Sequence, residues 1–359
     1  MTKPAPFYVR IYLFAIIVLL VLLVLGAISF FVDRAILGQT YARVPAATPN
    51  LLVTYDDYAN DYDREAVEFE LDGKTLRGYV YGPDNTHGLI IFRHGITSQH
   101  QDYLPFIIAM VDKGWKVFGY DAIGCGESDG DDVIGLSQSP IEVVAAIDFA
   151  RGSGMADGMN IALWGHSWGG YGVAAALGER ANDVSACITM SGYDTPLKEL
   201  KVGSSSFLGP FAFTQTPALW LNTFLVFGPG GNRSASDAII ESGVPTLVMH
   251  GVNDPVIPYE DVSILSNTVR DGSLPDNVSA ITFDVPGRSE HNSYFYSVES
   301  QKYLNECFEQ LQNLLDENGD DPNAPEVVAF MKGVDKHKAN TADPVLIEED
   351  DSFLAANIG

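Results

Sequence analysis

Short, continuously apolar runs alternate with segments of helical spacing along most of this 359-residue chain. Runs without polar alternation are typical of strands that are buried on both faces of a sheet. Strands that alternate with helices are joined by crossover connections, which build a mostly parallel sheet. We therefore expect an α/β fold. The expected strands are 88–92, 116–120, 161–164, 186–190, 246–250 and 280–285, and the expected helices are 102–114, 140–151, 169–177, 260–269 and 298–315.

Two further strand patterns precede this alternation. Ala66–Glu70 alternates apolar with polar residues, and Thr75–Tyr81 follows after the turn Asp72-Gly73. Because a tight turn joins antiparallel neighbours, we expect these two strands to form an antiparallel edge of the sheet.

The alternation breaks between Met190 and Thr246, where about fifty residues separate two strands, too many for a simple loop in a compact domain. This segment predicts an inserted cap at about 195–243. Its aromatic side chains are expected either to form the core of the cap or to line a pocket. They are Phe207, Phe211, Phe213, Trp220, Phe224 and Phe227.

The N-terminal segment is long and apolar. Ile11–Val32 has 22 residues without a charge, and its only polar side chains are Tyr12 and Ser29. As a helix it measures about 33 Å, which matches the core of a bilayer. We expect an uncleaved membrane anchor at 1–34, followed by a polar linker at 35–64. The alternatives are a signal peptide cleaved near Val44–Ala47 and a buried helix of a soluble protein.

Orientation of this anchor depends on few charges. Lys3, Arg10 and the N-terminal amine precede the apolar run, and Arg34 and Arg43 follow it. The amine tips the balance toward an N-terminus inside the cell, because positive charge favours the cytoplasmic side. We therefore expect a single-pass protein whose folded domain, at about 65–315, is extracytoplasmic.

Composition limits the classes of partner. The formal net charge of −26 argues against nucleic acid, because binding phosphates requires clustered Lys and Arg. Three cysteines give no disulfide framework, and no Cys/His spacing indicates zinc. The segment 316–359 carries eleven acidic and three basic residues and is expected to be an acidic C-terminal extension. Its Asp316–Asp320 run is not a calcium loop, because Asp321 stands where the loop needs glycine and no glutamate closes it. We expect no metal, no cofactor and no nucleic-acid partner, and no protein partner is indicated.

The stretch that carries chemistry is Asn160–Leu177. An expected strand leads into Gly165-His-Ser-Trp-Gly169, and an apolar helix follows. This is the context of a nucleophile elbow, in which small residues allow a tight turn and the serine sits at the helix N-terminus. The pattern predicts that Ser167 is a nucleophile.

A nucleophilic serine needs a base and an acid that orients the base. Asp254 follows an apolar strand in "PTLVMHGVNDP", and His291 follows the next strand in "ITFDVPGRSEHN". Each of the three residues comes just after a strand, and open parallel sheets build their sites at these ends. We predict a triad of Ser167, Asp254 and His291, with Asp121 and Asp284 as less suitably placed rivals for the acid.

An oxyanion hole completes the predicted site. His94-Gly95 ends an early strand, so the backbone N–H of Ile96 is one expected donor. The N–H of Trp168, just after the nucleophile, is the other. We expect His94, His166 and Cys125 to have structural roles.

These motifs resemble those of the α/β-hydrolase superfamily of serine hydrolases, and in particular its monoacylglycerol lipase-like and serine aminopeptidase-like group. The resemblance covers about 65–315 and implies a mostly parallel eight-stranded sheet with helices on both faces, a cap over the site, and catalysis without a cofactor. Many relatives have an arginine at the position of Ile123. The motifs that carry the resemblance are His94-Gly95, "YDAIGCGESDG", "GHSWGG", "HGVNDPVIP" and "EHN".

Function is predicted at the level of acyl transfer to water. The anchor and the aromatic cap favour small lipophilic acyl esters such as monoacylglycerols. A peptidase is the alternative, with Glu199, Glu241 or Glu290 binding a substrate amine. Acyl transfer to another acceptor and a non-catalytic binding protein on the same fold are further alternatives.

Overall fold

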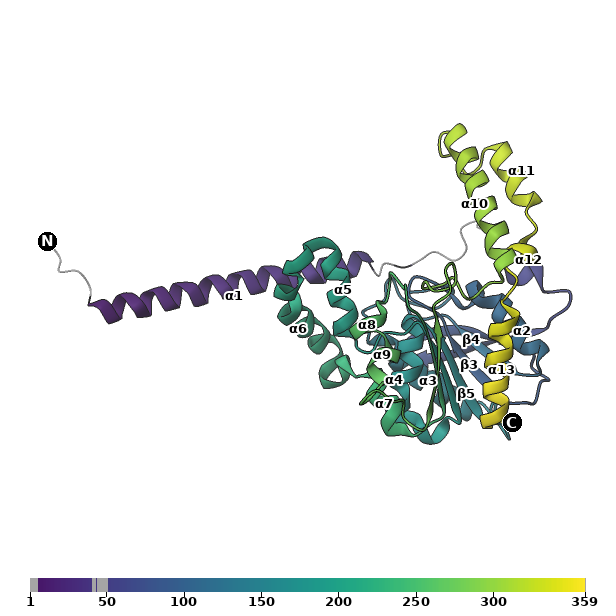
Figure 1. Ribbon diagram of the computed structural model, residues 1–359, viewed down its shortest axis with the longest axis horizontal. Coiled ribbons are helices and arrows are strands. Elements are labelled where there is room, and N and C mark those ends of the chain that lie inside the picture. The colour runs from purple at the N-terminus through teal and green to yellow at the C-terminus, as the bar shows by residue number, and fades with distance from the viewer. Residues whose placement is uncertain (1–5, 41–42, 44–50, 359) are drawn as a thin grey trace.

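The computed structural model describes residues 6–40, 43 and 51–358. Its centre is an eight-stranded sheet in the order β1-β2-β4-β3-β5-β6-β7-β8 (Figure 1). The first two strands form an antiparallel hairpin, β2 pairs antiparallel with β4, and all the other pairs are parallel. Both the parallel sheet and its antiparallel edge confirm the sequence prediction. The strands are β1 (Arg64–Leu71), β2 (Lys74–Tyr81), β3 (Leu89–Arg93), β4 (Lys116–Tyr120), β5 (Ile161–His166), β6 (Ala186–Met190), β7 (Thr246–Gly251) and β8 (Val278–Phe283).

Helices cover both faces of this sheet, as predicted. Apolar side chains of α3 (Gln138–Gly152), α4 (Trp168–Arg180), α7 (Ala235–Ser242) and α9 (Ile264–Thr268) form one buried cluster with one face. On the other face, α2 (Leu104–Asp112) and α13 (Pro344–Ile358) form a second cluster. The short 3-10 segment His100–Tyr103 leads into α2.

The C-terminal segment, expected as an acidic extension, forms helices, and its last helix packs on the sheet. The hairpin of α10 (Val298–Glu317) and α11 (Pro325–Gly333) projects away from the sheet, and α12 (Lys336–Ala339) leads back toward it (Figure 1). The last helix, α13, then returns to the sheet. Trp115 Nε1 donates to Asp351 at 2.7 Å, and Asn160 Nδ2 donates to the carbonyl of Ile358 at 3.1 Å. Helix α13 is therefore part of the domain core.

One carboxyl group in α13 is fully buried, and it supports a prediction about stability. Asp350 is 0% exposed, and neither of its oxygens forms a well-aligned hydrogen bond within the described residues. Burial raises the pKa of Asp350 well above its ordinary value, and the neighbouring Trp164 side chain offsets this only in part. The folded state therefore binds this proton more tightly than the unfolded chain, and stability falls as the pH rises through the range between the two pKa values. We expect Asp350→Asn to raise Tm at about pH 8 and to change it little at about pH 4.

Thermal unfolding at both pH values tests this expectation. Asp316→Asn, at an exposed position on α10, is the matched control and should leave Tm unchanged at either pH. A loss of Tm at pH 8 in Asp350→Asn would contradict the prediction.

The inserted segment between β6 and β7 consists of helices. The cap helices are α5 (Pro196–Leu208) and α6 (Thr216–Phe227), with 3-10 segments at Gly209–Gln215 and Gly228–Asn232. The following helix, α7, packs against α4 on the sheet. The prediction that the aromatic residues form the core of the cap or line a pocket is confirmed for Phe207 and Phe227, which line cavities. It is wrong for Phe211 and Phe213, which are 69% and 68% exposed and line neither cavity. The pattern showed aromatic content but not which side of each short helix faces outward.

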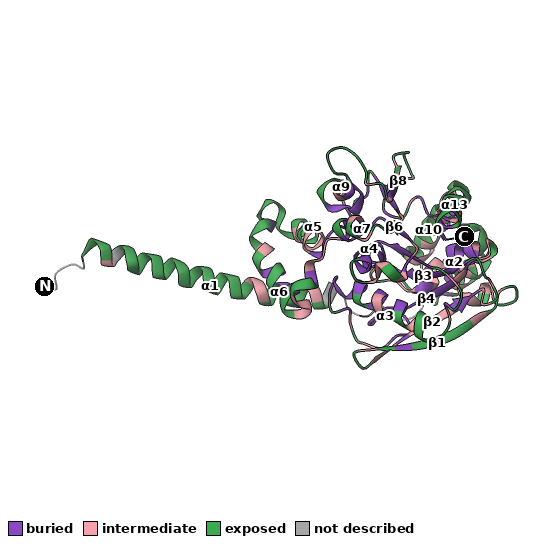
Figure 2. Ribbon diagram, turned by 90° about the horizontal axis from the view of Figure 1, so that it is seen from below, coloured by how far each residue is buried: buried purple, intermediate pink, exposed green. Residues whose placement is uncertain are grey.

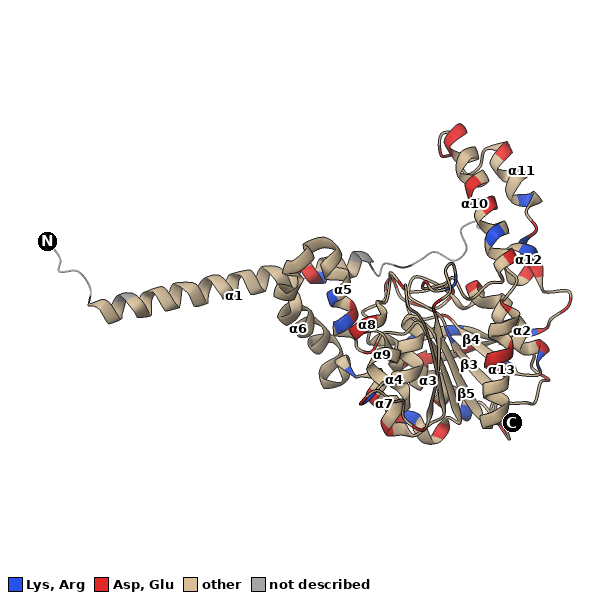
Figure 3. Ribbon diagram, viewed as in Figure 1, with Lys and Arg blue, Asp and Glu red and all other residues tan. Residues whose placement is uncertain are grey.

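Helix α1 (Phe7–Thr40) is one continuous helix that runs past the expected anchor boundary at residue 34. It is long and apolar enough to cross a membrane, judged by length and composition. Its side chains are exposed along most of its length and are largely uncharged (Figures 2 and 3). Near its C-terminal end α1 packs against α6, where Asn222 Nδ2 donates to the carbonyl of Phe30 at 3.3 Å. The cleavage site considered at Val44–Ala47 lies outside the described residues.

The single helix predicted at 260–269 is wrong. The structure has two short helices, α8 (Tyr259–Val262) and α9, because Asp261 adopts a left-handed conformation with φ of +63°. Ser263 then starts α9 by accepting a hydrogen bond from the N–H of Ser266 at 3.0 Å. A serine that caps a helix N-terminus stabilises a new start rather than continuation of the preceding helix.

Candidate active site

Ser167 occupies a tight turn between β5 and α4. Its backbone is left-handed, with φ of +57° and ψ of −117°, and its N–H donates to the carbonyl of Met190 at 2.8 Å. A Cβ on Gly169 would collide with the carbonyl oxygen of Arg93, and a Cβ on Gly165 would collide with that of Gly169. These contacts explain why the turn needs glycine on both sides, and they are the geometry expected of a nucleophile elbow.

Asp254 and His291 are joined directly. The Nδ1–H of His291 donates to Asp254 Oδ2 at 2.7 Å. The other carboxylate oxygen accepts the backbone N–H groups of Val256 and Ile257 at 2.8 and 2.9 Å. Burial opposes the charge on Asp254, but these hydrogen bonds and the nearby imidazole outweigh it and hold the pKa of this carboxyl below its ordinary value. Asp254 is therefore an ionised acceptor that fixes the His291 ring.

His166, the residue before Ser167, contacts His291. The Nε2–H of His166 donates to the backbone carbonyl of His291 at 3.3 Å, and the two rings lie 4.8 Å apart. Ser167 Oγ and His291 Nε2 make no hydrogen bond to any of the described residues. Catalytic hydrogen bonds are commonly long in unliganded enzymes, so the open Nε2 is compatible with a general base. Ser167, Asp254 and His291 are at most 9% exposed, so the site is largely shielded from bulk solvent.

The predicted oxyanion loop lies beside the nucleophile. A Cβ placed on Gly95 would be 3.6 Å from the Cβ of Ser167. The N–H groups of Ile96 and Trp168 donate to no acceptor in the described part of the chain. Trp168 begins α4, where the helix dipole favours negative charge. Both N–H groups are therefore free to serve as the predicted donors.

His94 holds the oxyanion loop in place through two hydrogen bonds of its ring. Its Nε2 accepts the N–H of Ala122 at 2.9 Å, which leaves Nδ1–H to donate to the carbonyl of Gly95 at 2.7 Å. Burial, together with the positive charge of Arg93, lowers the pKa of His94 to about 3. His94 is thus a neutral residue that holds the loop. Cys125 is also inert, because burial raises the pKa of its thiol to about 12.

A tyrosine that the sequence reasoning missed connects these parts. Gly95 N–H donates to Tyr103 Oη at 3.3 Å, and Tyr103 Oη–H donates to His166 Nδ1 at 2.8 Å. Burial and the neighbouring His291 hold the pKa of His166 well below its ordinary value, so His166 is neutral and can accept this proton. The chain of hydrogen bonds runs from the oxyanion loop to the loop of His291. No local motif marks Tyr103, which comes from the turn before α2.

Tyr103→Phe should therefore disturb the alignment of the site without removing a catalytic group. We expect kcat for an ester to fall about tenfold with KM and the pH profile little changed, since one buried hydrogen bond is worth about 1 kcal/mol or more. Tyr62→Phe, which removes a hydroxyl bonded to Asp112 at the surface, is the control. An unchanged kcat, or a loss that follows a large fall in Tm, would contradict a positioning role.

The rival acids are placed differently. Asp121 forms a buried pair with His100 at 2.6 Å and accepts the backbone N–H groups of His100 and Glu127, so it holds a loop. Asp284 is exposed beyond β8. Of the glutamates proposed for a substrate amine, Glu241 and Glu290 are exposed. Glu199 on α5 is close to Asp254, one of its oxygens has no described partner, and burial with the repulsion of Asp254 raises its pKa to about 8.

The sheet order, the turn after β5 and the helical cap define an α/β-hydrolase fold. Residues 84–203 match the family model of serine aminopeptidase, S33. This segment includes the oxyanion loop and the Ser167 turn but ends before Asp254 and His291.

Two further similarities agree with this class. The uncharacterized protein YfhR of Salmonella typhimurium is 26% identical over 222 residues, which cover 58% of this chain and 70% of that protein. The Pyrococcus furiosus esterase Pf2001 superposes with a TM-score of 0.53 at 17% identity, over 77% of this chain and 97% of that one. Together these matches establish the α/β-hydrolase fold and support a hydrolase.

Proposed function

We propose that this protein is a membrane-anchored serine hydrolase that cleaves lipophilic acyl esters, with Ser167, His291 and Asp254 as its triad. One observation carries the proposal: the 2.7 Å Asp254–His291 pair lies next to a serine held in a left-handed turn at the start of a helix. A turn serine without a chemical role would need neither the strained backbone nor a buried, oriented imidazole beside it.

The mechanism follows from these groups. Ser167 Oγ attacks the ester carbonyl carbon while His291 Nε2 takes its proton, and Asp254 stabilises the resulting imidazolium. The N–H groups of Ile96 and Trp168 stabilise the oxyanion. His291 returns the proton to the leaving alcohol as the C–O bond breaks. Water, deprotonated by His291, then attacks the acyl-enzyme. The bond to Ser167 Oγ breaks, His291 returns the proton to this oxygen, and the acid is released.

The surroundings of the site favour lipophilic substrates. Helix α1 is suited to a membrane, and the cap that it touches exposes phenylalanines on α5 and the adjoining 3-10 segment. A net charge of −26 gives no electrostatic attraction to anionic substrates. The charges around α1 favour an extracytoplasmic hydrolase domain. In that orientation the cap would face the extracytoplasmic surface of the membrane that α1 crosses.

A serine peptidase is the second candidate, and Glu199 is the observation that favours it. Its unpartnered oxygen near Asp254 is suited to a substrate amine. However, a pKa of about 8 leaves most of this carboxyl uncharged at neutral pH, which weakens its attraction for an ammonium group. We therefore place ester cleavage first.

A series of nitrophenyl esters, compared with aminoacyl nitroanilides, tests this order. We expect kcat/KM to rise from the acetyl ester to medium-length acyl esters and to exceed that of every amide. Ser167→Ala measures the background rate. A clear preference for acetyl esters would refute the lipophilic substrate class, and faster amide turnover would favour the peptidase.

A further inference from the structure

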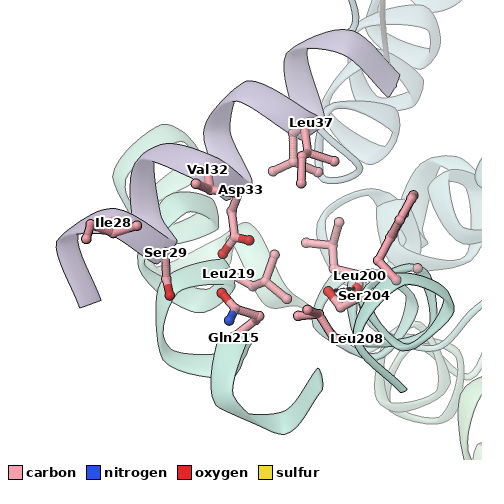
Figure 4. A pocket seen from close by; sticks show the side chains of 13 residues that line it. Ile28, Ser29, Val32, Asp33, Leu37, Leu200, Ser204, Leu208, Gln215 and Leu219 are labelled. Atoms are coloured by element: carbon pink, nitrogen blue, oxygen red, sulfur yellow. Dashed lines mark hydrogen bonds between the residues drawn. The ribbon is translucent and has the colours of Figure 1, made fainter. Parts of the chain in front are cut away.

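A cavity of about 400 Å³ lies between α1 and the cap (Figure 4). This volume is within the range of about 300–1,000 Å³ typical of small-molecule sites. Its walls are mainly aliphatic and come from three helices: Ile28, Val32 and Leu37 of α1, Leu200 and Leu208 of α5, and Leu219 of α6. None of the candidate catalytic residues lines it, so it is separate from the site described above.

Four polar side chains interrupt this apolar lining, and one of them, Ser204, already donates to the carbonyl of Leu200 at 2.8 Å. Ser29 and Asp33 of α1 point toward the space that Gln215 of the cap also faces (Figure 4). Asp33 is only 7% exposed, and its Oδ2 has no hydrogen-bond partner among the residues described. An unpaired carboxylate oxygen at such a position is costly unless a donor reaches it. The cavity therefore has an apolar body and one polar end, where Asp33 Oδ2 accepts no hydrogen bond from the described residues.

The position of this end along α1 matches the surface of a bilayer. The uncharged run of α1 ends at Val32, and Asp33 is the first charged residue after it. A run of this length fills the apolar core of a membrane, so Asp33 lies at the depth of the lipid headgroups. In the same cavity wall, the cap exposes Phe207 and Leu208 on α5. The cavity is thus positioned where a lipid has its polar end.

We infer that this cavity binds a neutral single-chain lipid with a hydroxyl-bearing headgroup, of the monoacylglycerol kind. A headgroup with two hydroxyls can donate to Asp33, and it can also donate to and accept from Gln215 and Ser29. An ammonium headgroup only donates, so it leaves the donors of Gln215 and Ser29 without an acceptor. Asp33 and the net charge of −26 disfavour anionic headgroups. The acyl chain lies along the aliphatic walls of α1 and α5.

Helix α5 connects this cavity with the candidate triad. Leu200 lines the cavity, and the preceding residue, Glu199, is close enough to Asp254 for the two carboxyl groups to interact. Successive residues of a helix point about 100° apart, so α5 has one side toward each site. The inference rests on the proposed function, and it adds that substrate is loaded from the bilayer between α1 and the cap.

The test uses the full chain in phosphatidylcholine nanodiscs and a monoalkylglycerol ether that carries a diazirine in its chain. This ether cannot be hydrolysed, so photolabelling reports binding alone. Gly203→Phe fills the cavity, because a Cβ on Gly203 meets no atom within 4 Å and leaves the backbone undisturbed. Ser206→Phe, at an exposed position of the same helix outside the cavity, is the matched control. A methyl ether of the same alkyl chain tests the headgroup.

We expect labelled peptides from α1 and the cap, and labelling that falls about tenfold in Gly203→Phe but not in Ser206→Phe. The preference for the glycerol ether over the methyl ether should fall several-fold in Asp33→Asn, which loses a charged acceptor. Labelling that persists in Gly203→Phe, or equal labelling by both ethers in the unmodified protein, would overturn the inference.

Turnover separates this inference from the proposed function. Absent ester turnover together with specific labelling would refute the hydrolase and support the lipid site. If the hydrolase and the loading route are both correct, Gly203→Phe should raise KM for a long-chain monoacylglycerol and leave the kcat/KM of a short soluble ester unchanged. Equal KM values for the long-chain substrate would refute the loading route. Unchanged Tm values verify that each variant is folded.

Discussion

Replacing Ser167 with alanine should lower kcat/KM for an ester by at least about 10⁴-fold, to the rate that binding and the oxyanion donors alone supply. Within the described part of the chain, Ser167 is the residue at the N-cap of α4, and its hydroxyl is the one that the proposal assigns to the Asp254–His291 pair. The substitution removes one oxygen and keeps the backbone, since alanine and serine are similarly strained at a φ of +57°. The loss should therefore appear in kcat with Tm almost unchanged.

Ser205→Ala, at an exposed position of the cap, is the control for this measurement. It should retain full activity. Residual turnover in Ser167→Ala above about 1% of the unmodified rate would indicate a different nucleophile, because a group that forms the covalent intermediate cannot be lost at such small cost.

Asp254→Asn should be the second most damaging change, with kcat about 10⁴-fold lower near neutral pH. Asp254 now accepts the Nδ1–H of His291 and two backbone N–H groups. An asparagine that presents its NH₂ to His291 would favour the opposite tautomer, in which Nε2 carries the proton and cannot accept one from Ser167. Initial rates across a pH series would measure this loss.

Asp284→Asn distinguishes this role from a general effect of charge. Asp284 follows β8, is exposed, and should be replaceable without change in kcat. Comparable losses in both variants would contradict the assignment of Asp254 as the orienting acid.

The parts of the fold that depend on local pattern were predictable. Continuous apolar runs predicted the central strands, and glycines on both sides of Ser167 predicted the tight turn, because a Cβ at Gly165 or Gly169 collides with backbone oxygens. Ser167, Asp254 and His291 each follow an expected strand in the sequence, which predicted that they lie at strand ends. These features depend on contacts near in sequence or on the direction of parallel strands.

Features that depend on packing between distant segments were not predictable. Tyr103 gains its place between Gly95 and His166 only once α2 has packed on the sheet. The break at Asp261 is set by the left-handed backbone of that residue, which hydrophobic spacing does not show. The packing of α13 into the core could not be predicted from the sequence either, because the acidic composition of this helix resembles that of an exposed tail. The cavity at Asp33 arises only where α1 meets the cap.

The central claim is that Ser167 is the nucleophile of an acyl-enzyme mechanism. It is tested most directly by treating the folded, full-length protein with a fluorophosphonate and locating the adduct by peptide mass spectrometry. We predict a single adduct on the Oγ of Ser167, and its loss when His291 is replaced by alanine. A folded protein that forms no adduct, or forms one on another serine, would contradict this account.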